Sequence, residues 1–109
     1  MAVLTIRAHQ RFAVRSPSKM KRTGARTLEC LLIELSQDGA RVSNLGDAQF
    51  EIDDEVTLTT GDGHSFPAII RWSRKGCAGL RLTRPLYQAE LLEIITAARG
   101  EEPAQAKVA

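Results

Sequence analysis

The sequence predicts a mainly β protein, in which a small antiparallel barrel is followed by one helix near the C-terminal end. Short segments of alternating or continuous apolar residues recur between residues 27 and 82, and turn-forming residues separate them. From residue 85 the apolar residues recur at helical spacing instead. The chain of 109 residues, 43% of them apolar, has the size and composition of one compact domain with one core.

The first two of these strands are predicted on either side of a tight turn. The run "TLECLLIEL" (27–35) is almost continuously apolar and too short for a typical helix, so we expect a strand that is buried on both faces. The segment "GARVS" (39–43) resumes the alternation and places Ala40 and Val42 on one face. Between them, "SQDG" consists of turn-forming residues and predicts a hairpin-type connection.

Three further strands are predicted downstream. The segment "VTLTT" (56–60) follows an acidic loop and precedes the turn "GDGH". The segment "GLRL" (79–82) directs Leu80 and Leu82 inward. Short strands at this spacing, joined by tight turns, are typical of a small antiparallel barrel. The segment "FPAIIRW" (66–72) places four residues on one face, namely Phe66, Ala68, Ile70 and Trp72.

The end of the chain predicts one helix that packs on the barrel. Pro85 suits a first helical turn, and Gly100 is expected to end the helix. We therefore expect residues 1–99 to form a single domain and residues 100–109 to be a flexible tail. The apolar residues at helical spacing are Tyr87, Leu91, Ile94, Ile95 and Ala98.

The net charge of +2 conceals an uneven distribution. The segment up to Leu28 contains seven Lys and Arg residues and no acid, whereas the remainder contains eight against all thirteen acids. We therefore expect residues 1–26 to form a basic N-terminal arm that meets an anion. Arg11 and Arg15 lie four positions apart in this arm, and planar guanidinium groups can grip a phosphate or the O6/N7 edge of guanine through paired hydrogen bonds.

Two other interpretations of the arm remain at this point. One is a basic arm that is merely solvated. The other is a nonspecific nucleic-acid binder, which would show a steep salt dependence and no preference for guanine. The composition argues against nonspecific nucleic-acid binding, because only 5% of the residues are aromatic and few of them are available to stack on bases.

No sequence motif supports catalysis or metal binding. Cys30 and Cys77 lack the spacing and the histidine neighbours of a zinc site, so we expect reduced thiols. Neither His9 nor His64 has a carboxylate or nucleophile at a recognisable motif spacing. No apolar run approaches the roughly 20 residues of a membrane helix. We expect a cytoplasmic binding protein with no enzymatic activity, cofactor or membrane insertion.

Two short motifs resemble the signatures of the PilZ domain family. The segment "RFAVR" (11–15) resembles that family's R-x-x-x-R motif. The segment "ELSQDG" (34–39) resembles its second motif, an Asp or Asn followed by x-S-x-x-G, and the separation of the two motifs is close to that of the family. The later segments "DEVTLTT", "AIIRWSR" and "GLRL" resemble its later strands, so the resemblance covers residues 10 to about 95.

This resemblance implies a six-stranded antiparallel PilZ barrel with a C-terminal helix that binds cyclic di-GMP, a bacterial second messenger. Carried over to this chain, it implies that Arg11 and Arg15 clamp phosphate and the Hoogsteen edge of guanine. It implies that Ser36 contacts base or phosphate, and that Gly39 lets the chain turn closely beneath the ligand. The arm would become ordered on binding and signal to a protein partner.

Two positions depart from the family pattern. Glu34 stands where Asp or Asn is usual; it can accept from guanine N1–H and N2–H, but its extra methylene displaces the acceptor, so a reduced affinity is expected. Gln10 stands where many members have a further arginine. Both departures favour the alternative function, a PilZ-type adaptor for motility, pili or secretion that does not bind the nucleotide.

Trp72 has two possible roles. It shares the parity of Phe66 and Ile70, which favours packing in the core. The alternative is that its ring stacks on a guanine near the rim of the barrel.

Overall fold

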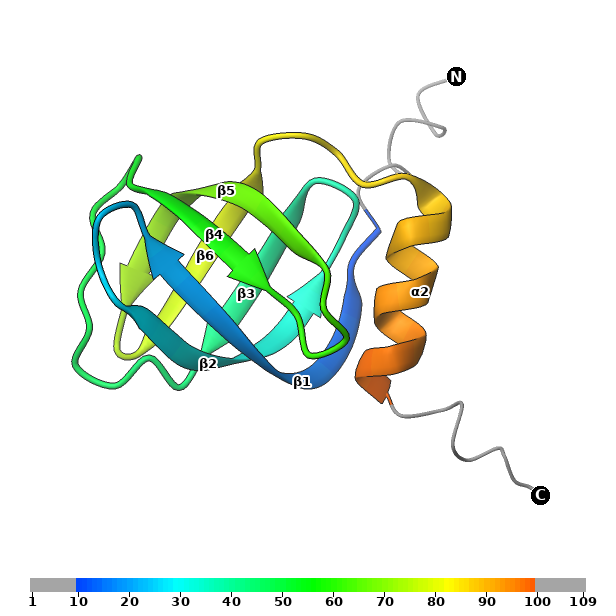
Figure 1. The fold of residues 1–109 in the computed structure, drawn as a ribbon, viewed down its shortest axis with the longest axis horizontal. Helices are drawn as coiled ribbons and strands as arrows, with labels where there is room; N and C mark the ends of the chain where they lie inside the picture. The colour runs from blue at the N-terminus through cyan, green and yellow to red at the C-terminus, as the bar shows by residue number, and fades with distance from the viewer. Residues whose placement is uncertain (1–9, 100–109) are drawn as a thin grey trace.

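The computed structural model describes residues 10–99 and consists of a closed barrel with one helix beside it (Figure 1). All six strands pair antiparallel in the order β1-β2-β3-β6-β5-β4, and β4 returns to β1 to close the barrel. The predicted fold is therefore confirmed. The elements are β1 (Phe12–Arg22), β2 (Thr27–Leu35), β3 (Gly39–Ser43), β4 (Glu55–Thr59), β5 (Ser65–Arg74), β6 (Cys77–Leu82) and α2 (Gln88–Arg99).

The basic segment is part of the barrel. Residues 12–22 form β1, the longest strand, so the expectation of an N-terminal arm over residues 1–26 is wrong for this stretch. Val14, Ser16, Ser18 and Met20 alternate inward, while the cations between them point outward to solvent. The hydroxyl of Ser18 donates to the carbonyl of Ser16 at 3.0 Å, which satisfies a polar group inside the barrel.

Strand β2 has the predicted bounds but only one buried face. Cys30, Leu32 and Leu35 are buried, whereas Leu31 and Ile33 between them are partly exposed, so the expectation of burial on both faces is wrong. One face of the strand borders the barrel interior, and a bulge between Leu32 and Glu34 shifts the alternation so that Leu35 is buried. Burial raises the pKa of the Cys30 thiol to about 11.

The helix packs on the barrel through Leu91, Ile94 and Ile95, as its periodicity predicts. The expectation that Tyr87 faces inward is wrong, because Tyr87 is 72% exposed and Leu86 is buried in its place. The helix begins at Gln88, so residue 87 precedes the helical periodicity. The backbone N–H of Tyr87 donates to the carboxylate of Glu90 at 3.0 Å, and this hydrogen bond caps the first turn of the helix. Gly100 lies outside the described residues.

Both ends of α2 are hydrogen-bonded to the barrel. The guanidinium of Arg99 donates from two nitrogens to the carbonyl of Ala13 in β1, at 3.2 and 2.9 Å. Before the helix, Leu86 N–H donates to the carbonyl of Gln37 at 2.7 Å, and the Gln37 side chain donates back to Leu86 at 3.1 Å. The helix is thus fixed to β1 and to the β2–β3 turn. Within the described residues, no helix has the length and apolar character needed to span a membrane.

The β4–β5 turn contacts α2 through His64. Its Nδ1 lies 3.0 Å from Asp62 and its Nε2 lies 3.4 Å from Glu93 of the helix. The hydrogen bond to Asp62 raises the pKa of His64 against an opposing effect of burial, and the negative charges of Asp62 and Glu93 act in the same direction as the hydrogen bond. Burial alone would raise the pKa of Asp62, but hydrogen bonds from Thr60 and His64 outweigh it and lower that pKa.

Candidate ligand-binding site

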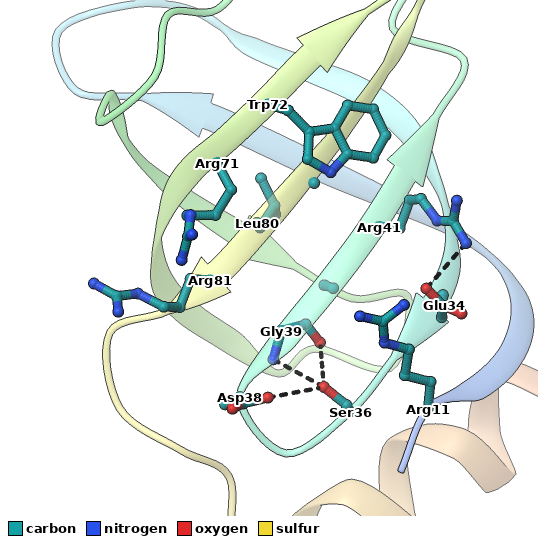
Figure 2. A pocket seen from close by; sticks show the side chains of 12 residues that line it. Arg11, Glu34, Ser36, Asp38, Gly39, Arg41, Arg71, Trp72, Leu80 and Arg81 are labelled. Carbon is teal, nitrogen blue, oxygen red and sulfur yellow. Dashed lines mark hydrogen bonds and ion pairs between the residues drawn. The ribbon is translucent and has the colours of Figure 1, made fainter. Parts of the chain in front are cut away.

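An open cavity of about 460 Å³ lies on the outer surface of the barrel over β3 and β6 (Figure 2). We call it the β3–β6 cavity. Four arginines line it, from three of the strands and from the residue before β1, together with the carboxylates Glu34 and Asp38. The cationic side chains are therefore in excess, and the cavity is suited to an anion. These arginines are Arg11, Arg41, Arg71 and Arg81.

Two glycines line the cavity between its walls. In the β3–β6 ladder Gly39 pairs with Arg81 and Arg41 pairs with Gly79, so each glycine stands opposite an arginine. A Cβ at Gly39 would lie 3.1 Å from the carbonyl oxygen of Leu80, which shows how closely β3 and β6 approach there. At Gly39 the floor of the cavity is therefore bare backbone, whereas the indole of Trp72 fills the space over Gly79.

Trp72 forms one wall of the cavity, so the expectation that it packs in the core is wrong. In the β5–β6 ladder Ile70 pairs with Leu80, but Trp72 pairs with Gly79, which leaves Arg71 as an extra residue in β5. This bulge inverts the parity of the strand and turns Trp72 outward. The indole lies against Gly79, where a Cβ would meet its Cε2 at 2.6 Å. The guanidinium carbon of Arg74 lies 5.4 Å from the ring centroid.

Glu34 and Arg41 form an ion pair at the opposite wall. The two residues pair directly across the β2–β3 ladder, and Arg41 Nη2 donates to Glu34 Oε1 at 3.1 Å (Figure 2). The Arg41 side chain is 44% exposed and that of Glu34 is 25% exposed. Pairs of this exposure contribute about 0–1 kcal/mol to stability, so the Glu34–Arg41 ion pair costs little to open.

Ser36 holds the turn that leads into β3. Its hydroxyl oxygen accepts from the backbone N–H of Gly39 at 3.0 Å and lies 3.2 Å from Asp38 Oδ1, to which it donates. The backbone N–H of Ser36 donates to the Gly39 carbonyl at 2.9 Å. Ser36 is buried, with 6% of its surface exposed. Its hydroxyl therefore fixes the conformation of the turn at the edge of the cavity.

Comparison with known proteins assigns the chain to a family. The profile described as "PilZ domain" matches residues 5–97. The chain belongs to the PilZ family. This confirms the resemblance found in the sequence, and the family's known function is the binding of cyclic di-GMP. PilZ domains are binding and adaptor modules rather than enzymes.

Two solved structures have a similar fold. The PilZ domain of CeSA from a cellulose-synthesizing bacterium superposes with a TM-score of 0.62 at 22% identity, covering 85% of this chain and 98% of that one. The Bacillus subtilis inhibitor of motility (MotI/DgrA) superposes with a TM-score of 0.61 at 11% identity, covering 91% of this chain. This chain spans about half of that protein, 52% of its length. No curated protein matches the sequence.

The structure brings all of the predicted PilZ site residues except Arg15 to the β3–β6 cavity. Arg11, Glu34, Ser36, Gly39 and Trp72 all line the β3–β6 cavity. Arg15 does not line it and is exposed on β1. Of the two arginines of the first motif, Arg11 precedes β1 and lines the cavity, whereas Arg15 lies within β1 and does not.

Three arginines of the cavity were not among the residues that the sequence motifs predict. Arg41 alternates with the buried Ala40 and Val42, and Arg81 alternates with Leu80 and Leu82, so strand parity alone could have placed both side chains outside. Arg71 follows the buried Ile70, so the same alternation also places it outside, and only Trp72 beyond it is affected by the bulge. Among residues 10–99, no group of three or more His, Cys, Asp or Glu residues is arranged to hold a metal ion.

Proposed function

We propose that this PilZ domain binds cyclic di-GMP in the β3–β6 cavity. The observation that supports the proposal is the meeting of the two motif segments there, with Arg11 from the first and Glu34, Ser36 and Gly39 from the second. The cavity is open and arginine-rich, which suits a ligand with two phosphates and two guanines.

The chemistry of each group fits one part of this ligand. A guanidinium such as that of Arg11 can donate in parallel to a phosphate or to guanine O6 and N7. The Glu34 carboxylate can accept from guanine N1–H and N2–H. The indole of Trp72 offers a flat surface against which a base can stack, a contact worth about 1–3 kcal/mol.

The proposed activity is recognition without a catalytic step. As a receptor, the domain would transmit the bound state to a protein partner, and we expect this to happen in the cytoplasm. The cavity supplies positive charge and a stacking surface, and neither requires a cofactor.

Calorimetric titration of the purified protein with cyclic di-GMP tests this function, with GTP and a short single-stranded DNA as controls. We expect saturable binding with a dissociation constant in the micromolar range or below, selective for the cyclic dinucleotide. Arg11→Gln is expected to weaken binding by about 1.5–3 kcal/mol, because charge-assisted hydrogen bonds are lost. No heat at about 100 μM ligand, with a folded protein confirmed by circular dichroism, would rule the function out. Binding of the DNA with a steep salt dependence would instead favour nonspecific nucleic-acid binding.

A second candidate is a PilZ adaptor that does not bind the nucleotide. It is favoured by the engagement of Glu34 with Arg41 and of the Ser36 hydroxyl within its own turn. These two polar groups already have partners inside the protein, which is what a purely structural role would require. A folded protein that gives no heat in the titration would leave the adaptor as the working function.

A further inference from the structure

Arg71 and Arg81 line the β3–β6 cavity but lie outside both sequence motifs. Both residues are exposed, and they lie on neighbouring strands, since Arg81 of β6 pairs with Ile69 of β5, two residues before Arg71. Figure 2 shows their side chains together on one side of the cavity, across from Arg11 and Arg41. The cavity therefore has a second cationic end that the motifs do not account for.

Within residues 10–99, the guanidinium groups of Arg71 and Arg81 have no acidic partner. No carboxylate of the described chain lies within ion-pair distance of either group, whereas Arg41 in the same cavity is paired with Glu34. Like charges on adjacent strands repel each other, and an anion held between them removes this cost. The arginine pair is therefore arranged to meet an anionic group of a ligand.

The surroundings of the pair suit a phosphate that lies next to a base. Arg81 stands opposite Gly39 in the β3–β6 ladder, so the floor of the cavity beside it is bare backbone. In β5, the bulge turns Trp72 to the face that Arg71 already occupies, so the indole directly follows the cation along the chain. A phosphate between the two guanidinium groups would thus lie beside a surface on which a base can stack.

We propose that Arg71 and Arg81 form a second phosphate subsite of the β3–β6 cavity. This inference rests on the proposed binding of cyclic di-GMP, and it leaves the phosphate contacts of the first motif as they are. Both guanidinium groups donate to oxygens of one phosphate. This phosphate belongs either to the other half of the same cyclic dinucleotide or to a second molecule of it, and the two sources differ in the number of molecules that bind.

The test is a calorimetric titration of cyclic di-GMP into the unmodified protein, Arg71→Gln, Arg81→Gln and the double variant. The matched control is Arg84→Gln, which removes the same charge from an exposed position in the connection between β6 and α2, outside the cavity. We expect each single variant to weaken binding at the subsite at least about tenfold, and the control to change the affinity by less than about threefold. Arg81→Lys is expected to recover part of the loss, because lysine keeps the charge without the planar fork.

The number of molecules bound identifies the source of the phosphate. If the unmodified protein binds one molecule and the double variant binds it more weakly, the phosphate belongs to that molecule. If the unmodified protein binds two molecules and the double variant binds one, the phosphate belongs to the second molecule. Unchanged affinity and number in the double variant, or an equal loss in Arg84→Gln, would overturn the inference and leave the receptor function standing. Absence of binding by the unmodified protein would overturn both.

Thermal unfolding separates contact with the ligand from a role in the fold. Because neither arginine has an acidic partner within residues 10–99, the double variant without ligand is expected to have a Tm equal to or above that of the unmodified protein. Addition of cyclic di-GMP should raise the Tm of the unmodified protein more than that of the double variant. A lower Tm without ligand, together with an equal rise on addition of ligand, would overturn the inference, because the arginines would then stabilise the barrel and not the complex.

Discussion

Replacing Gly79 with alanine is expected to displace Trp72 and destabilise the barrel. A Cβ at position 79 would lie 2.6 Å from Cε2 and 2.8 Å from Cδ1 of the indole. Carbon atoms in contact prefer about 3.5–4.0 Å, so the ring must retreat by roughly 1 Å or more. Gly79 itself has no positive φ, which means that alanine brings no backbone strain.

The expected loss of stability follows from these contacts. Overpacking costs about 1–3 kcal/mol, and the half-buried indole can swing toward solvent, which places the change near the lower end. Alanine in a strand also recovers about 0.5–1 kcal/mol relative to glycine. We therefore expect Gly79→Ala to lower the free energy of unfolding by about 1 kcal/mol.

The assay is urea denaturation followed by circular dichroism, in the unmodified protein and in Trp72→Ala. Without the indole there is nothing for the new methyl group to displace, so Gly79→Ala is expected to be neutral or slightly stabilising in Trp72→Ala. Fluorescence of Trp72, the chain's single tryptophan, should also shift in Gly79→Ala because the ring becomes more hydrated. An equal loss of stability in both backgrounds would refute the reasoning, since the cost would then come from the strand and not from the ring.

Three further outcomes are expected. Arg99→Gln should lower the free energy of unfolding by about 1 kcal/mol in urea denaturation, because it removes both hydrogen bonds to the Ala13 carbonyl; an unchanged midpoint would contradict this. His64 has a raised pKa in the folded state, so its contribution is complete below its ordinary pKa of 6.5 and is lost as the pH rises through the folded pKa. The difference in thermal stability between the unmodified protein and His64→Gln should therefore shrink as the pH rises above 6.5, and a constant difference would contradict this. Iodoacetamide at about pH 8 should modify Cys77 before Cys30, because the Cys30 thiol is buried and has a pKa of about 11. Mass spectrometry of the labelled native protein measures the order of modification, and early labelling of Cys30 would contradict the prediction.

The strands were predictable where apolar residues occupy the inward-facing positions of the strand. The segments 27–35 and 39–43 become β2 and β3 with the predicted bounds, because apolar inward residues and the turn between them define both ends. Strand β1 escaped the prediction because two of its inward positions are Ser16 and Ser18. Because the inward positions hold serines and the outward positions hold cations, this stretch has no apolar alternation in the sequence. The hydroxyls are buried only because the strand is part of the barrel.

The site was predictable as far as its motifs extend. The motif residues other than Arg15 line one cavity, because the turn at Ser36 places the second motif beside the residue that precedes β1. The outward position of Trp72 was not predictable, since a single extra residue in β5 reverses the parity on which the expectation depended. Arg15 was misplaced for a related reason: the spacing of a motif does not say whether the chain between its residues is a loop or a strand.

The closure of the barrel leaves more than half of β1 without a neighbouring strand on its β4 side. Its pairing with β4 covers only Lys19–Arg22, so on that side the backbone from Phe12 to Ser18 forms a sheet edge. Such edges invite strands from other molecules, but this one is blocked. Proline at position 17 has no N–H to offer, Arg99 already occupies the carbonyl of Ala13, and the turn at Gly61 lies so close that a Cβ there would be 2.9 Å from the Pro17 oxygen. An incoming strand therefore finds few backbone groups with which to pair, and this segment is protected against edge-to-edge aggregation.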